Sequence, residues 1–304
     1  MKISESAVPV RLIAIDIDGT LLPSTGTVVS ERNREALKRA EAAGVEVVIA
    51  TGRRQAYAMP LLEPLGLRPE SVMISSNGTV TRSFGGERLD RWLLPVETAR
   101  RLCGELRKFG GTTVFTFDRV GQRELVIESE EQLHQRIDKW VEANREHLEV
   151  VVPLERAFDE GVAPVQGMVC GTVGAMRRAE EQLRADGFTE FVAMQRTEYP
   201  ARDLSILDIL PLGCSKGSAL ERLAKRLHVR REEVAAIGDN YNDLEMLEWA
   251  GQPVLMANAA PELLDIAEER GWRITVSNDQ DGVAAAVEEF LAVPATAGAG
   301  LEEF

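Results

Sequence analysis

Short apolar runs alternate with helical patterns in the first 80 residues of the chain. The runs 12–15, 45–50 and 71–78 carry almost no charge, which is typical of strands that are buried on both faces of a parallel sheet. Between the first two runs, Ser30 is a candidate N-cap for a helix, and Gly44 is the candidate stop after that helix. Strand–helix–strand repetition of this kind predicts a parallel sheet with right-handed crossovers.

The same alternation returns near the C-terminus. It predicts two helices and three strand segments, in chain order a helix over 217–229, a strand and turn over 233–240, a helix over 242–251, and strands within 253–259 and 272–278. The tail after Val293 is rich in small residues and is expected to fray. We therefore expect the first and last parts of the chain to build one α/β core.

The middle of the chain has a different pattern. Apolar residues recur at helical spacing in the stretches 99–109, 133–148 and 176–183. Strand-like segments lie between and after these stretches, at 112–117, 124–129, 165–173, 190–195 and 204–210. The pattern predicts a doubly wound α/β core, residues 1–84 and 211–304, that is interrupted by an inserted α+β domain, residues 85–210.

Composition and charge limit the functions that this fold can have. Of the 304 residues 44% are hydrophobic and 28% are charged, as in soluble globular proteins. The formal net charge of −14 repels polyanions, so we expect no broad binding to nucleic acid or to an anionic membrane. The three cysteines have no CxxC spacing, and no apolar stretch approaches the roughly 20 residues of a membrane helix. We expect a cytoplasmic protein, and both a monomer and a homodimer are compatible with the sequence.

Acidic residues follow two of the predicted strands. Asp16 and Asp18 stand at the end of the run 12–15, and Asp239 follows a second apolar run. Ligands of parallel α/β sheets bind at the carboxyl ends of the strands. Like charges this close together need a cation, and Mg²⁺ prefers oxygen ligands of this type. Asp243, at the start of a predicted helix, would contact a metal-bound water or orient a ligand.

Phosphate-binding groups follow two other strands. Thr51 and Gly52 come directly after the run 45–50, and Lys216 stands where a helix is predicted to begin. A lysine, a hydroxyl and the free amide groups of a helix start are together typical of phosphate sites. Combined with the acidic pairs, these residues indicate phosphoryl transfer.

Four segments carry a resemblance to a known family. They are "DIDGT" (16–20), "ATGR" (50–53), "SKGSAL" (215–220) and "GDNYNDLEM" (238–246). In type and order they resemble the haloacid dehalogenase (HAD) superfamily of phosphohydrolases. The large insertion, together with "ISSNGT" (74–79) before it, resembles the Cof-type sugar-phosphate phosphatases. The resemblance implies a HAD-like, Rossmannoid core with an inserted cap that sets substrate specificity.

The resemblance also implies catalytic roles for individual residues. Asp16 would be the nucleophile and form an aspartyl-phosphate. Asp18 would protonate the leaving oxygen and then act as the base for the hydrolytic water. Thr51 and Lys216 would hold the transferring phosphoryl group.

Further residues would bind metal and phosphate on the same grounds. Asp16, the backbone carbonyl of Asp18, and Asp239 would ligate Mg²⁺, with Asp243 supporting this site. Asn242 would contact the phosphate or its waters. A calcium-binding loop is an alternative interpretation of the acidic segment that begins at Asp16, but this segment lacks the residues that the calcium-loop pattern requires.

Some polar residues have two interpretations. Arg53 either contacts substrate or pairs with a surface carboxylate, and the sequence favours neither. Asn77 either reaches the site or shapes a turn before Gly78, and we favour the turn. Arg196 and Arg202 either face an anionic substrate or are ordinary surface arginines, which we favour.

The sequence thus predicts a Mg²⁺-dependent phosphatase that acts on a small phosphorylated metabolite, either a sugar phosphate or a nucleotide-like compound. The main alternative is a phosphotransferase or phosphomutase on the same scaffold, in which the acyl-phosphate passes its phosphoryl group to a sugar hydroxyl instead of water. A phospho-acceptor signalling module is disfavoured, since it needs neither Asp18 nor a large insertion.

Overall fold

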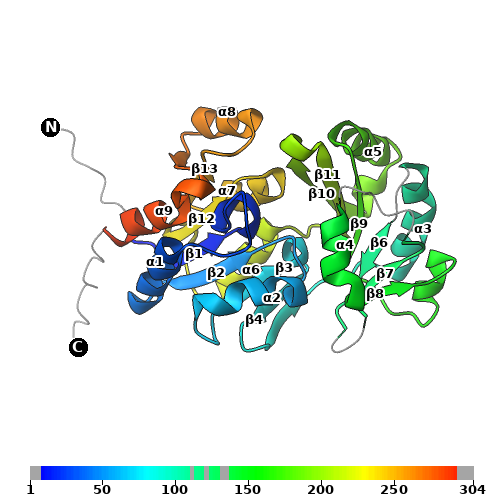
Figure 1. The fold of residues 1–304 in the computed structure, drawn as a ribbon, viewed down its shortest axis with the longest axis horizontal. Coiled ribbons are helices and arrows are strands. Elements are labelled where there is room, and N and C mark those ends of the chain that lie inside the picture. The colour runs from blue at the N-terminus through cyan, green and yellow to red at the C-terminus, as the bar shows by residue number, and fades with distance from the viewer. Residues whose placement is uncertain (1–7, 110–112, 120–122, 131–136, 293–304) are drawn as a thin grey trace, which may run out of the picture.

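Two β-sheets organise the chain, of which the computed structural model describes residues 8–109, 113–119, 123–130 and 137–292 (Figure 1). The first sheet has the strand order β14-β13-β12-β1-β2-β3-β4-β5. Its strands are β1 (Leu12–Ile15), β2 (Glu46–Ala50), β3 (Val72–Ser75), β4 (Val80–Ser83), β5 (Arg88–Arg91), β12 (Val234–Gly238), β13 (Gln252–Met256) and β14 (Arg273–Thr275). The strands from β14 to β3 are parallel, as predicted. Two antiparallel strands, β4 and β5, extend the sheet, because the tight turn after β3 permits only antiparallel pairing.

Helices cover both faces of this sheet, which makes it doubly wound. They are α1 (Glu31–Ala42), α2 (Gln55–Leu62), α6 (Lys216–Arg226), α7 (Leu244–Trp249), α8 (Pro261–Glu269) and α9 (Gly282–Leu291). Ile13 and Ile15 of β1 pack with α1, α2 and α9, whereas Leu12 and Ala14 pack with α6, α7 and α8. Because β1 is buried on both faces, its sequence is an uninterrupted apolar run.

Local signals fixed the ends of the first helix. The Ser30 hydroxyl accepts a hydrogen bond from the Asn33 N–H, which confirms Ser30 as the N-cap of α1. Gly44 follows the helix with a φ of +82°, a left-handed conformation that suits glycine. Among the described helices, none combines the length and apolar character that crossing a bilayer requires.

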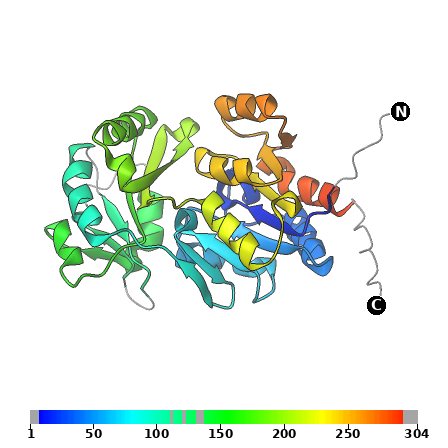
Figure 2. The same ribbon diagram turned by 180° about the vertical axis from the view of Figure 1, so that it is seen from behind.

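The second sheet has the strand order β10-β11-β9-β6-β7-β8. Its strands are β6 (Val114–Thr116), β7 (Leu125–Ile127), β8 (Leu148–Val150), β9 (Gln166–Gly171), β10 (Val192–Tyr199) and β11 (Leu204–Pro211). Its helices are α3 (Val96–Leu106), α4 (Asp138–Asn144) and α5 (Val173–Ala185). Figures 1 and 2 show this α+β unit beside the first sheet, to which the chain returns after β11. The tail predicted to fray after Val293, and Leu133 of the predicted middle helix, lie outside the described residues.

The two faces of the second sheet differ in their surroundings. Phe115, Val169 and Leu207 point to one face and belong to a core cluster with α3 and α5. Residues on the other face form a smaller apolar cluster with α4, and several of them line a cavity. This face of the second sheet therefore forms one wall of the cavity.

Candidate active site

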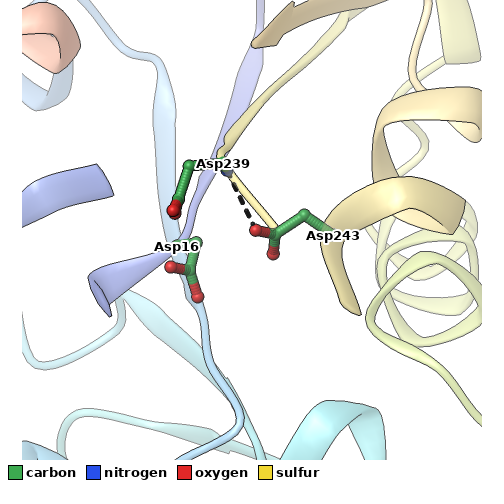
Figure 3. A group of neighbouring side chains, drawn as sticks. All are labelled: Asp16, Asp239 and Asp243. Atoms are coloured by element: carbon green, nitrogen blue, oxygen red, sulfur yellow. Dashed lines mark hydrogen bonds between the residues drawn. The ribbon is translucent and has the colours of Figure 1, made fainter. Parts of the chain in front are cut away.

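Three of the predicted aspartates meet at the carboxyl ends of β1 and β12. Asp16 follows β1 and Asp239 follows β12, and the parallel pairing of Ile15 with Ile237 makes these two strands neighbours. Asp243 lies just before α7, and carboxylate oxygens of Asp16, Asp239 and Asp243 lie within 4.8 Å of one another (Figure 3). All three aspartates are buried, so three like charges share a small space.

Lys216 places a positive charge among these carboxylates. It is the first residue of α6, whose N-cap Ser215 accepts a hydrogen bond from the Ser218 N–H. The Lys216 Nζ donates to Asp16 Oδ1 at 2.5 Å and to Asp243 Oδ1 at 2.7 Å, and its side chain is fully buried. Burial alone would lower the pKa of Lys216, but the charges of Asp16 and Asp243 outweigh burial and hold that pKa above its usual value.

Contacts around the end of β12 hold the other two carboxylates in place. Asp243 Oδ2 accepts hydrogen bonds from the N–H groups of Asp239 and Asn240, both at 3.1 Å. The Thr20 hydroxyl donates to Asp239 Oδ1 at 2.7 Å. A Cβ at Gly238 would lie 2.6 Å from the Asp243 side chain, so only glycine fits there. The acidic group is therefore built into the fold rather than left at a surface.

One lysine does not balance three buried carboxylates. Burial, together with repulsion from Asp243, raises the pKa of Asp16 to about 7 even though Lys216 opposes that rise. Burial and the charge of Asp16 also raise the pKa of Asp239 well above its usual value. A divalent cation would relieve this repulsion, and an all-oxygen donor set suits Mg²⁺. Asp16, Asp239 and Asp243 are thus the side chains that fit such an ion, directly or through its water.

Asp18 lies outside this group of three carboxylates and is bound by Arg53. Arg53 Nε donates to Asp18 Oδ2 at 2.7 Å, and Arg53 Nη2 donates to Asp18 Oδ1 at 2.6 Å. The guanidinium also lies over the Tyr57 ring, 4.6 Å from its centroid. Arg53 therefore pairs with a carboxylate, as one of its two interpretations predicts. Both Arg53 and Asp18 line the cavity, so this pair does not lie at an outer surface. The expected metal contact of Asp18 concerns its backbone carbonyl and stays a prediction.

Thr51 and Asn77 follow β2 and β3. Thr51 is fully buried, and its Oγ1 accepts a hydrogen bond from the Arg53 N–H at 3.1 Å. Asn77 has a φ of +53°, so it shapes a turn, yet its Oδ1 also accepts from Asn242 Nδ2 at 3.0 Å. A Cβ at Gly52 would lie 3.1 Å from Asn77 Oδ1, so the backbone here approaches the amide closely. Asn77 thus has both a turn role and a side-chain role.

A cavity of about 730 Å³ lies between the two sheets at this point. The predicted site residues on its wall are Asp16, Asp18, Gly52, Arg53 and Asn242. The predicted site residues that are buried beside it, off the wall, are Thr51, Asn77, Lys216, Asp239 and Asp243. The structure therefore brings all the predicted residues to one place, with the second sheet opposite them.

The second sheet contributes wall residues that the sequence analysis did not identify. Among them are Gln166, Tyr199 and Asp208. Asp208 carried a usable signal, because it is a carboxylate within the apolar run 204–210, as Asp16 is beside its own run. Gln166 and Tyr199 carried no such signal, since tyrosine is common in strands and one glutamine in a strand-like segment does not mark a site.

The two arginines considered in the insertion lie in different places. Arg196, on β10, pairs with Glu180, as the surface interpretation predicts. Arg202 is exposed but lines the cavity, which keeps it within reach of a bound ligand.

The chain is similar to known proteins over most of its length. The haloacid dehalogenase-like hydrolase family matches residues 13–287 of the chain. The phosphatase YwpJ of Bacillus subtilis (strain 168) is 32% identical over 309 residues, which cover 92% of this chain and 100% of YwpJ. The 5-amino-6-(5-phospho-D-ribitylamino)uracil phosphatase YwtE of the same organism is 30% identical over 298 residues, which cover 92% of this chain and 98% of YwtE.

Solved structures show the same fold. A haloacid dehalogenase-like hydrolase from B. subtilis is 28% identical with a TM-score of 0.74, and the match covers 91% of this chain and 99% of that one. Another, from Bacteroides thetaiotaomicron, is 29% identical with a TM-score of 0.71, and the match covers 92% and 99%. The chain therefore belongs to the haloacid dehalogenase-like hydrolase family, as a phosphatase of the Cof type.

Proposed function

We propose that the chain is a Mg²⁺-dependent phosphatase that hydrolyses the monoester of a small phosphorylated metabolite through a covalent aspartyl-phosphate on Asp16. The observation that carries this proposal is the buried Lys216 Nζ, which joins Asp16 and Asp243 beside the cavity. A carboxylate is a competent nucleophile towards phosphate only when nearby positive charge relieves their repulsion. Relatives named for phosphorylated aminouracil and HMP-PP support a small-molecule substrate.

The first step forms the covalent intermediate. A carboxylate oxygen of Asp16 attacks phosphorus, and the bond between phosphorus and the leaving oxygen breaks as the new bond forms. Asp18, on the same wall of the cavity, would enter this step protonated, with one of its two hydrogen bonds from Arg53 released, and would give that proton to the leaving oxygen. Bound Mg²⁺ would neutralise charge on the phosphoryl oxygens. Lys216 adds a fixed positive charge to the same end of the site.

The second step releases inorganic phosphate. Asp18 takes a proton from a water molecule, the water oxygen attacks phosphorus, and the bond to Asp16 breaks. The paired hydrogen bonds from Arg53 position the Asp18 carboxylate for this transfer. Thr51 and Asn242 would hold the phosphoryl oxygens in both steps, so positioning supplies much of the rate enhancement.

The inserted unit would act as a cap on the core. It begins after β5 and not at residue 85 as predicted, because β5 pairs with β4 in the first sheet, and its last strand, β11, ends at Pro211. Its sheet supplies the wall opposite the aspartates, where it would exclude water and contact the leaving group. Arg54 of the first unit already donates hydrogen bonds to Glu124 and Asn144 of the second. The leaving group, a sugar or a nucleotide-like moiety, would fill the cavity between them.

Phosphate release from p-nitrophenyl phosphate and from a panel of phosphorylated sugars and nucleotides tests the proposal. We expect release with Mg²⁺, none with EDTA, and none from Asp16→Asn. Asp159→Asn is the matched control, because Asp159 is half exposed in the second unit and pairs only with Arg100 among the described residues. Metal-independent release, or full activity of Asp16→Asn, would contradict the proposal. Transfer of the phosphoryl group to a sugar hydroxyl instead of water would identify a phosphotransferase.

A further inference from the structure

Two buried polar side chains of the second sheet face the cavity opposite the aspartates. Gln166, on β9, is 5% exposed, and Asp208, on β11, is 4% exposed, yet both line the cavity. Asp208 Oδ1 accepts a hydrogen bond from Gln166 Nε2 at 2.7 Å, and Asp208 Oδ2 accepts one from Asn77 Nδ2 at 2.8 Å. Buried polar groups at a cavity wall are expected to serve either the fold or a ligand.

The bond to Asp208 fixes the direction in which the Gln166 amide points. Gln166 Nε2 is the atom that donates to Asp208 Oδ1, so the amide nitrogen faces the carboxyl group and the amide oxygen faces away from it. Within the described part of the chain, this buried Gln166 Oε1 has no hydrogen-bond partner. A buried acceptor without a partner is rare in native proteins. Because Gln166 lines the cavity, a ligand that donates a hydrogen bond is the partner that this acceptor lacks.

The same hydrogen-bond chain continues to the phosphate end of the cavity. Asn77 donates to Asp208 and accepts from Asn242 at 3.0 Å, and Asn242 lines the cavity. Hydrogen bonds through Asp208 and Asn77 therefore connect the Gln166 amide to Asn242, a residue that we expect to contact phosphate. A leaving group attached to that phosphate would meet the wall that carries Gln166.

Apolar side chains flank this polar pair on the same wall. Leu204, Ile206 and Asp208 alternate along β11, and all three line the cavity. Met168 lies directly across from Asp208 in the pairing of β9 with β11, and Val114 lies across from Met168 in the pairing of β6 with β9. These two also line the cavity. The wall thus combines one fixed acceptor with an apolar surface.

We infer that Gln166 is a specificity-determining residue, whose Oε1 accepts a hydrogen bond from an O–H or N–H of the leaving group while an apolar part of that group packs on Met168 and Ile206. Asp208 is a positioning residue that acts through the Gln166 amide. The inference rests on the proposed phosphatase function and narrows its substrate. The preferred ester carries both a donor and an apolar, ring-like part, as a nucleotide does, whereas a simple sugar phosphate leaves the apolar wall uncovered.

Three phosphate esters separate these features. Uridine 5′-monophosphate has donors and a ring, ribose 5-phosphate has donors without the ring, and p-nitrophenyl phosphate has a ring without a donor. For the wild-type protein, we expect kcat/KM for the nucleotide to exceed that for ribose 5-phosphate by about tenfold or more, which corresponds to about 1.4 kcal/mol. Gln166→Met keeps the side-chain length and removes the acceptor. We expect it to lower the ratio of kcat/KM for the nucleotide to kcat/KM for p-nitrophenyl phosphate by about tenfold. Asp208→Asn is expected to lower the same ratio, because it frees the Gln166 amide to turn.

Gln195→Met is the matched control. Gln195 is 7% exposed on β10, donates a hydrogen bond to Glu245 at 2.7 Å, and is not on the cavity wall. It is expected to leave the ratio unchanged. An equal loss on all three esters in Gln166→Met would show a merely structural role and overturn the inference, as would a wild-type preference for ribose 5-phosphate. An absence of metal-dependent turnover of p-nitrophenyl phosphate by the wild-type protein would overturn the proposed function itself, and the inference with it.

Discussion

Replacing Lys216 with methionine tests whether the buried charges of the site depend on one another. Lys216→Met keeps an unbranched side chain but removes the cation that lies 2.5 Å from Asp16 Oδ1 and 2.7 Å from Asp243 Oδ1. Removing one partner of a buried ion pair costs about 3–5 kcal/mol, because the other partner stays buried and uncompensated. For domains of 150–250 residues, 1 kcal/mol shifts Tm by roughly 2–4 °C, and the shift becomes smaller as the chain grows. For this chain of 304 residues we therefore expect Tm to fall by an amount in the lower part of roughly 6–20 °C.

Thermal unfolding in EDTA and in Mg²⁺ measures this effect. The loss in Lys216→Met should be largest in EDTA and smaller in Mg²⁺, because a bound cation would replace part of the missing charge. Lys225→Met is the matched control, since Lys225 is 72% exposed and pairs only with Glu221 among the described residues. Its stability should change by no more than about 0.5 kcal/mol. Turnover of Lys216→Met should fall by about 10²-fold or more.

A second variant separates charge from packing. Asp16→Asn in the Lys216→Met background removes one of the carboxylates that the lysine compensated, so it should restore part of the lost stability. Equal Tm values for Lys216→Met and Lys225→Met, or no recovery in the double variant, would refute the view that Lys216 neutralises the acidic group.

Three further predictions concern the proton carrier, the cavity wall and the backbone. Asp18→Asn should lower steady-state turnover of p-nitrophenyl phosphate by about 10²–10⁴-fold, because it removes the proposed acid and base; wild-type turnover would exclude that role. Burial raises the pKa of Asp208 from 3.8 to about 7, so the folded protein binds this proton more tightly than the unfolded chain. The contribution of Asp208 to stability should therefore fall as the pH rises from 3.8 towards 7. Urea unfolding at saturating Mg²⁺ should show that the stability of the wild-type protein relative to Asp208→Asn falls over this range, and a difference that does not change with pH would contradict this. Gly78→Ala should be more destabilised than Gly26→Ala, although φ is +101° at Gly78 and +104° at Gly26, because only the Cβ at position 78 would meet a backbone oxygen, that of Ser215 at 2.1 Å. Equal urea midpoints would show that the clash relaxes.

Local pattern was sufficient to predict the core strands and the acidic end of the site. The run 12–15 became β1 with the same bounds, because a strand buried on both faces has to be apolar throughout. Asp16 was conspicuous for the same reason, as a charge that directly follows such a run. The turn at Asn77 was also predictable from its place before Gly78, whereas its left-handed φ of +53° was not.

Contacts between distant segments were beyond the reach of the sequence. The Asn77 side chain bonds to Asp208 and Asn242, which are 131 and 165 residues away along the chain. Whether Gln166 faces the cavity depends on the pairing register of β9 and on how the two sheets lie against each other. Neither the register nor the arrangement of the sheets can be predicted from nearby residues. Alternation along a strand defines its two faces, but it does not say which face borders a cavity.

The central claim is that phosphate is transferred to Asp16, and chemical trapping tests it most directly. Asp18→Asn protein would be mixed with p-nitrophenyl phosphate and Mg²⁺, quenched in acid within the first turnover, reduced with borohydride and analysed by peptide mass spectrometry. Borohydride reduces an aspartyl-phosphate to homoserine. The account predicts homoserine at position 16, dependent on both substrate and Mg²⁺. Homoserine at another position, or an unmodified Asp16 during a burst of p-nitrophenol release, would contradict it.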